Sequence, residues 1–320
     1  MGTELNIPQG LRPINTAFQI LAADFQTAGT EGAFHAYTQT ITSGGELQLQ
    51  IHHLANIPVM RKWTGARRNK FVRHYSQSVG YDDFEATLPI KTNLISSDPH
   101  GIISSLLPAF VGQLGAYDAS MASAYDASSG AGPTGFDGAA LFSTAHPHSS
   151  SGGNQSNLDA TTNLSHANLV AAEYNGMLLT QENGEPVGVR YNEMRVGPKL
   201  MQRALELLGP TAQYVVGLDA SDATGGTSVS HVKKESMYAG KMKLLVDDRV
   251  TTFYWDLMDT AKGPVRPMVQ FLVKPPTAVV RDEPTDPHVW EHREALYGVE
   301  GQWGVAAGHW YTCRRATGTA

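Results

Sequence analysis

The residues with the clearest metal-ligating pattern are His288, Glu291 and His292, which lie in the segment His288-Val289-Trp290-Glu291-His292. This order fits H-x-x-E-H, in which two imidazoles one helical turn apart hold zinc and the glutamate acts as general base. The pattern needs a helix, but residues 282–287 favour turns and residues 295–299 have the composition of a strand. A zinc-dependent peptidase is therefore kept only as an alternative hypothesis, and we predict no metal site.

Other patterns that support catalysis or nucleotide binding are incomplete. No G-x-S-x-G elbow is present, and Ser143, three residues before His146, has no third group to orient that base. The glycine-rich segment 130–135 is not followed by the Gly-Lys-Ser/Thr of a phosphate-binding loop. Gly240-Lys241 is followed by Met242, which offers Mg²⁺ no hydroxyl. We expect no enzymatic activity, no catalytic residue and no cofactor.

Length, net charge and cysteine count exclude several further classes of protein. The chain has 320 residues, enough for one large or two modest domains, and its formal net charge of −6 argues against a dedicated nucleic-acid-binding protein. A single cysteine, Cys313, excludes an internal disulfide framework and fits a reducing compartment. No apolar run reaches the roughly 18 residues of a membrane span, and the N-terminus has no signal-peptide pattern.

The most charged stretch of the chain contains cations and no acid. Its basic residues are Arg61, Lys62, Arg67, Arg68, Lys70 and Arg73. Alternating apolar residues then predict strands over 71–79 and 84–90, joined into a hairpin by the turn Gly80–Asp83. A two-stranded hairpin is marginal in water, so it should lie on another surface. A solvated charged face and a nucleic-acid contact are the alternatives; we favour docking onto the acidic surface of another subunit.

Helical spacing marks two segments before the middle of the chain. Residues 13–29 predict a short amphipathic helix. Apolar residues from Ile103 to Ala124 recur every three or four positions, which predicts a helix of about 30 Å, with Pro108 either bending it or lying in its first turn. The Ser/Gly/Asn-rich stretch that follows, within residues 136–158, predicts a loop.

The second half of the chain predicts two helices and then strands. Ser165 is a candidate cap for a helix with Leu169, Ala172, Met177 and Leu178 on its inner face. Gly197-Pro198 opens another, with an inner face of Leu200, Met201, Ala204, Leu205 and Leu208. A strand at Tyr214–Leu218 precedes a long loop from Asp219 to Lys234. The expected tail strands are Leu244–Val246, Thr252–Leu257, Val269–Val273, Ala278–Arg281, Glu294–Val299 and Gly308–Arg314.

Five ordered segments, spread between about residues 13 and 312, carry a family resemblance. They are Pro58–Gly65, Tyr81–Ile90, Gly101–Pro108, the stretch Asp137–Pro147 with Asn154–Leu158, and a tail segment running from Lys274-Pro275-Pro276 through Asp286-Pro287 to Leu296–Val299. Taken together, this set resembles the Mu-like prophage major head subunits, which are coat proteins of tailed phages.

The resemblance implies an α+β protein with the HK97-type capsid fold. Its parts would be an N-terminal arm (1–57), an extended loop (58–92), a spine helix with part of the peripheral domain (93–164), an axial domain (165–240), and peripheral or axial strands with the C-terminus (241–320). The loop near the five- or six-fold axes would then carry Asp219, Asp222 and Thr224.

The implied function is that of a major capsid protein in the virion, assembled in the host cytoplasm. Pentamers and hexamers of the chain would form an icosahedral shell around double-stranded DNA, which is enclosed without specific binding. Portal and scaffold proteins are the implied partners, with a decoration protein as a further candidate. A cellular, encapsulin-like nanocompartment shell of the same fold is a second alternative.

We expect the contacts between subunits to be electrostatic at the extended loop. The basic residues named above, together with Trp63, should meet acids of an adjacent chain. The proposed acidic counterparts are Asp282, Glu283, Asp286, Glu291 and Glu294.

Overall fold

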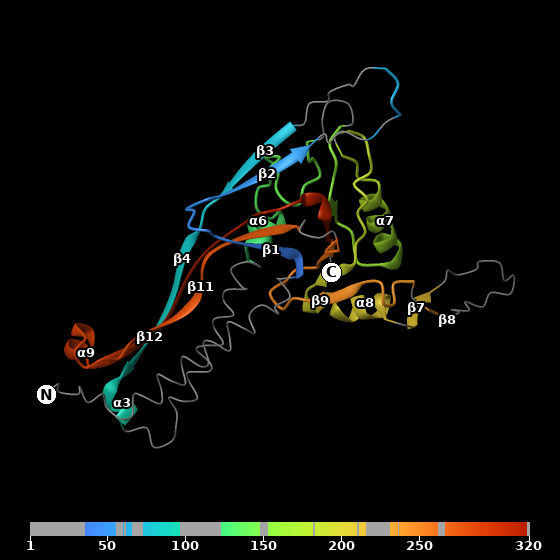
Figure 1. Ribbon diagram of the computed structural model, residues 1–320. Coiled ribbons are helices and arrows are strands. Elements are labelled where there is room, and N and C mark those ends of the chain that lie inside the picture. Colours follow the sequence, from blue (N-terminus) through green and yellow to red (C-terminus); the bar gives the residue numbers. More distant parts are fainter. Residues whose placement is uncertain are drawn as a thin grey trace. The chain divides into compact units, whose positions relative to one another are not determined.

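The computed structural model describes residues 36–55, 60, 62–65, 73–96, 123–147, 153–181, 183–209, 211–215, 231–235, 237–261 and 266–318. Two compact units are present (Figure 1). Unit 1 comprises residues 1–51, 78–125 and 269–306, and unit 2 comprises residues 52–77, 126–268 and 307–320. The predicted helices at 13–29 and over most of 103–124 lie outside the described residues.

Unit 1 is built on a four-stranded sheet in the order β1-β11-β12-β4. Its strands are β1 (Thr38–Thr42), β4 (Asp82–Lys91), β11 (Met268–Arg281) and β12 (Glu294–Ala307). Figure 1 shows β4, β11 and β12 running side by side, with the short helices α3 (Thr92–Ser96) and α9 (Pro287–His292) at one end. The β1 pairing reaches Leu272, whose carbonyl accepts from the Ser43 amide, and β11 continues well beyond it.

The long antiparallel pair β4–β12 explains the alternating sequence of residues 84–90. Its register runs from Glu294 opposite Lys91 to Trp303 opposite Asp82. Phe84 stacks on the Trp303 ring at a centroid distance of 4.0 Å, and Ile90 is buried. Such cross-strand contacts between side chains on one face are what stabilise a sheet.

The predicted hairpin between residues 71–79 and 84–90 is wrong, although both strands exist. β3 (Arg73–Val79) pairs with β2 (Leu49–Ala55), whereas β4 pairs with β12. The chain changes sheets at Gly80-Tyr81, and Gly304 of β12 lies against this point. A Cβ on Gly304 would sit 1.8 Å from the Gly80 carbonyl oxygen, so only glycine permits the approach.

Unit 2 contains a five-stranded mixed sheet in the order β5-β13-β10-β6-β9. Its strands are β5 (Leu158–Ala160), β6 (Glu193–Val196), β9 (Lys243–Val246), β10 (Tyr254–Met258) and β13 (Cys313–Thr317). β10 pairs antiparallel with both β13 and β6, while β5 and β9 join as parallel outer strands. Trp255, Leu257 and Met258 of the central strand are buried, so β10 lies in the core of this unit.

The two predicted helices of the second half are confirmed, but their buried faces differ from the prediction. α7 (His166–Met177) begins after Ser165, whose hydroxyl accepts from the Asn168 amide, as a helix N-cap does. α8 (Pro198–Leu208) begins after Gly197. α7 buries Leu169, Ala172 and Gly176 and leaves Leu178 exposed; α8 buries Ala204, Leu207 and Leu208 and leaves Met201 and Leu205 exposed.

The tail strands are fewer and longer than predicted. The segments 269–273 and 278–281 belong to one strand, β11, which also contains Pro275 and Pro276. The last predicted strand is shifted: Trp310–Thr312 form a 3₁₀ turn, and β13 begins only at Cys313. β7 (Thr211–Val215) pairs with β8 (His231–Glu235), so the expected loop 219–234 ends in a strand.

Candidate functional site

Most of the predicted basic contact surface lies outside the described residues. Arg61, Arg67, Arg68 and Lys70 belong to that undescribed part, as do the loop residues Asp219, Asp222 and Thr224. Lys62 and Trp63 are exposed, and the Trp63 indole donates to the Gly65 carbonyl at 2.6 Å. Arg73 is the first residue of β3. How these residues meet another chain therefore stays a prediction.

The five predicted acidic counterparts gather around α9 in unit 1. Asp286 caps this helix through the His288 amide and also accepts two hydrogen bonds from Arg281, at 2.9 and 2.8 Å. The hydrogen bonds from Arg281 keep the pKa of the Asp286 carboxyl below its usual value. Asp282 is buried and Glu294 opens β12, whereas Glu283 and Glu291 are exposed. Beside them, Trp290 is 79% exposed.

The zinc hypothesis is not supported. The segment does form a short helix, α9, and the rings of His288 and His292 lie 4.6 Å apart between centroids. However, the part of the chain that the structure describes holds no group of three His, Cys, Asp or Glu side chains that could bind a metal. Glu291 is exposed on a surface helix, where it has no enclosed site in which to act as base.

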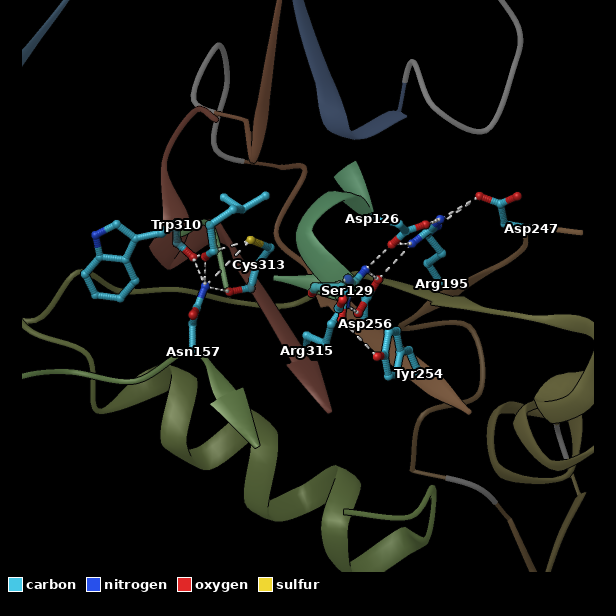
Figure 2. A network of polar contacts seen from close by, with 12 residues as sticks. Asp126, Ser129, Asn157, Arg195, Asp247, Tyr254, Asp256, Trp310, Cys313 and Arg315 are labelled. Carbon is cyan, nitrogen blue, oxygen red and sulfur yellow. Dashed lines mark hydrogen bonds and ion pairs between the residues drawn. The ribbon is translucent and has the colours of Figure 1, made fainter. Parts of the chain in front are cut away.

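A buried row of charges runs across the sheet of unit 2 (Figure 2). Asp256 of the central strand stands opposite Arg315 of β13 on one side and Arg195 of β6 on the other. Arg315 donates to both carboxylate oxygens of Asp256 at 2.7 Å, and Arg195 donates to one of them at 3.0 Å. All three side chains are buried, so the row joins three strands by charge-assisted hydrogen bonds.

Two further aspartates close this network. Asp126 accepts from Arg195 at 2.6 Å and from Arg315 at 2.6 Å, and Asp247 accepts from Arg195 at 2.8 Å. Burial alone would raise the pKa of Asp126, but hydrogen bonds and charge from Arg195 and Arg315 together lower it below its usual value. Arg315 also donates to the Gly130 carbonyl at 2.7 Å. The network therefore fastens the segment around α6 (Ala127–Gly130) to the sheet.

A second buried polar group holds the loop that precedes β5. The Asn157 amide nitrogen donates to the carbonyls of Leu141, Trp310 and Cys313, which fixes its oxygen as an acceptor (Figure 2). His146 faces this oxygen with Nε2 at 3.0 Å and Asp137 with Nδ1 at 2.7 Å. The His146 ring thus lies between these two side chains and stacks on Trp310 at a centroid distance of 4.1 Å.

Aromatic side chains and two histidines cluster where β2 and β3 meet this loop. His53 stacks on Phe136 at 4.1 Å and contacts His309 edge-on at 4.7 Å. Burial lowers the pKa of His309 to about 4, and the nearby His53 adds to this effect. Burial also lowers the pKa of His53, although the nearby Gln77 side chain and the charge of Asp137 oppose this effect. Both imidazoles are therefore neutral and belong to the core of unit 2.

Sequence reasoning missed these buried charges, although a signal for them is present. Arg195 stands between Met194 and Val196 in a strand, and Asp256 stands between Trp255 and Leu257. A charge flanked by apolar strand residues indicates a buried, paired group, because charged side chains are rarely buried alone. The partner cannot be found in this way, since Asp126 lies 69 positions from Arg195 in the chain.

Solved structures similar to the whole chain are phage-type shells. The chain matches a subunit of the procapsid of bacteriophage JBD30 with 17% identity and a TM-score of 0.53, over 98% of this chain and 76% of that one. It matches the capsid of a native GTA particle with 11% identity and a TM-score of 0.56, over 90% of each chain. A subunit of a JBD30 capsid decorated with minor capsid protein trimers matches with 15% identity and a TM-score of 0.50, over 68% of this chain and 90% of that one.

These matches define the class: the chain has the HK97-type capsid fold, an α+β architecture, as the resemblance implied. Residues 14–163 match the model of the Mu-like prophage major head subunit gpT family. This match and the likeness to capsid subunits support a major head subunit, the major capsid protein of a tailed phage, and neither a peptidase nor a nanocompartment shell is supported. No curated protein matches the sequence. None of the described helices is long and apolar enough to cross a membrane.

Proposed function

We propose that this head subunit self-assembles into pentamers and hexamers, which close as an icosahedral shell around double-stranded DNA. The family match over residues 14–163 carries the proposal, because a head subunit acts through contacts with further copies of itself. Standard interfaces bury about 800 Å² per partner, and several of them closed by symmetry give a shell far more stable than one contact. The net charge of −6 suits a container that does not grip its DNA.

The proposal places one set of contacts between the basic residues 61–73 and the acids around α9 of an adjacent chain. Glu283 and Glu291 are the best placed of the five acids, because they are exposed while Asp286 is engaged by Arg281. Trp290, exposed beside them, would add apolar contact area. Assembly would take place in the host cytoplasm, with portal and scaffold proteins as partners, and a decoration protein could bind the finished shell.

Charge reversal tests this pairing. Arg67→Glu with Arg68→Glu should block shell formation by repelling the acids around α9, while the subunit stays folded by circular dichroism. Adding Glu283→Lys and Glu291→Lys should restore shells in negative-stain micrographs. A matched control is Arg203→Glu on α8, where the exposed arginine forms an ion pair with Glu206 of its own helix and donates to the Leu164 carbonyl of the same unit. Normal shells from the double arginine variant would show that the pairing is wrong.

A further inference from the structure

Two histidines face each other on the exposed side of the sheet formed by β2 and β3. His52 Nδ1 lies 2.7 Å from His74 Nε2, and the two rings are 4.7 Å apart between centroids with a tilt of 32°. Both side chains are exposed, and Ser76, which follows on the same face of β3, is exposed too and adds no charge. Solvent therefore reaches both rings, and the proposed function gives the pair no role.

The strands that carry the pair are anchored through their other face. His53, next to His52, is buried and stacks on Phe136 at a centroid distance of 4.1 Å. Tyr75, next to His74, contacts the same ring at 5.9 Å. Because successive side chains of a strand point to opposite faces, these inner contacts direct His52 and His74 outward. The two imidazoles are thus held opposite each other before a ligand arrives, which lowers the entropy cost of binding one.

The contact between the two rings leaves a place for one cation. Two N–H groups cannot face each other at 2.7 Å, so a single proton lies between the two nitrogens. In the neutral pair, one ring donates this proton and the other ring offers its lone pair. If the proton moves to the outer nitrogen of the donor ring, with no net loss, both rings present a lone pair to the same point. A divalent cation can then take the place of the shared proton.

We propose that His52 and His74 bind a divalent transition-metal ion of the zinc type between β2 and β3. Neutral imidazole suits Zn²⁺, Ni²⁺ and Cu²⁺, whereas Mg²⁺ and Ca²⁺ prefer oxygen ligands. Two Zn–N bonds of about 2.0–2.1 Å at the tetrahedral angle require nitrogens about 3.3 Å apart. The pair must open by about 0.6 Å from its 2.7 Å contact, which small rotations of two exposed side chains supply. With water in the remaining positions, the affinity should be moderate.

A bound ion would strengthen the pairing of the two strands. β2 and β3 form a two-stranded sheet, and such a sheet is marginal in water. An ion that needs both strands in place stabilises their pairing by mass action. We therefore expect zinc to slow amide hydrogen exchange in β2 and β3. The site belongs to the single chain, so this inference does not rest on the proposed function.

Equilibrium dialysis of the purified chain against Zn²⁺ tests the site. His52→Gln and His74→Gln each keep a polar, hydrogen-bonding side chain but remove a zinc ligand. Each should lower the affinity of the site at least about tenfold, because even the groups that orient a ligand contribute that much. His292→Gln removes another exposed histidine, on α9, and should leave the affinity unchanged. Excess Mg²⁺ should not displace the zinc, whereas acid should, because a protonated imidazole is not a ligand.

Chemical modification of the wild-type chain locates the ion without any substitution. Diethyl pyrocarbonate reacts with accessible imidazoles, and mass spectrometry of the peptides reports each histidine separately. At a zinc concentration about ten times the dissociation constant, the reaction of His52 and His74 should slow about tenfold. The reaction of His292 should proceed at the same rate with and without zinc.

Each result decides for or against the pair. A loss of affinity confined to the His52 and His74 variants, with protection of the same two residues, would establish the site. Equal zinc affinity in the wild type and both variants would overturn the inference, and so would modification of the pair that zinc does not slow. A loss from His292→Gln as large as that from the pair variants would place the ion elsewhere and overturn it too. Shell assembly is a separate measurement, so none of these results bears on the proposed function.

Discussion

The two compact units differ in where their ion pairs lie. Unit 2 buries Arg195 and Arg315 in one sheet, where they pair with Asp256 of the sheet and with Asp126 and Asp247 from segments next to it. Unit 1 keeps its described ion pairs at the surface, where Lys274 meets Glu300 and Arg281 meets Asp286. A buried network fixes one arrangement because any loosening leaves a charge unpaired, whereas a surface pair in water contributes little.

Burial of side chains follows the same division. The central strand of unit 2, β10, buries four of its five residues, whereas β4 of unit 1 buries only Ile90 among its ten. β4 therefore leaves much of its surface to water in the single chain, whereas its partner β12 buries nine of its fourteen residues. The exposed strand of unit 1 is thus β4, and the burial in unit 2 is concentrated at the centre of its sheet.

The largest predicted effect is at the buried charge network of unit 2, and its absence would contradict the difference between the two units. Arg195→Met replaces a buried cation by an uncharged side chain of similar length. It leaves Asp247 without the arginine that donates to it at 2.8 Å. We expect a loss of about 3–5 kcal/mol in the free energy of unfolding, because an uncompensated buried charge remains. Urea unfolding of the unassembled subunit, followed by tryptophan fluorescence, measures it.

The matched control lies in unit 1. Arg281→Met removes an exposed arginine that pairs with Asp286 at the surface, so the unfolding midpoint should stay close to that of the wild type. Equal losses from the two variants would mean that the buried network does not distinguish unit 2 from unit 1. A small loss from both would show that the buried charges are not coupled to folding.

Local signals in the sequence predicted the elements better than their partners. Ser165 and Gly197-Pro198 predicted the starts of α7 and α8 correctly, because caps act within one turn. The pairing of β3 with β2 and of β4 with β12 could not be predicted from residues 71–90. The alternation of apolar and polar residues in a strand shows which side chains are buried, but it does not identify the partner strand. The prediction of a local hairpin chose the nearest partner in sequence and was wrong.

The site shows the same limit. Helical spacing predicted Met201 and Leu205 on the inner face of α8, yet both are exposed, because the spacing of apolar residues alone does not say which of them are buried. Sequence reasoning missed the buried arginines. Their partners come from distant segments, such as Asp126 for Arg195, and no spacing rule joins them.

A pH titration sharpens the comparison at the histidine cluster of unit 2. The pKa of His309 is about 4 in the folded chain, below the ordinary value of 6.5, so the unfolded chain binds the proton more readily. Stability should therefore be complete above pH 6.5 and fall as the pH drops toward 4, by up to about 3 kcal/mol. Urea unfolding at several pH values measures this slope.

The control for this titration is again in unit 1. His309→Phe should flatten the acid slope, because the group that takes up the proton on unfolding is gone. His292→Phe removes an imidazole that is exposed on α9, and it should leave the slope of the wild type in place. A slope unchanged by His309→Phe would mean that this buried imidazole does not control the acid sensitivity of unit 2.

The smallest predicted effect concerns a tightly packed position in unit 1 where only glycine fits. Gly304 of β12 lies against the backbone of Gly80, and an added Cβ would meet the Gly80 carbonyl oxygen and the Tyr81 Cα, at 1.8 and 3.2 Å. Because these are backbone atoms, no rotamer relieves the clash, and Gly304→Ala should cost about 1–3 kcal/mol. Gly44→Ala, with nothing within 4 Å of its Cβ, is the control. If both alanines are tolerated equally in urea unfolding, the change of sheets at Gly80 is not held by this contact.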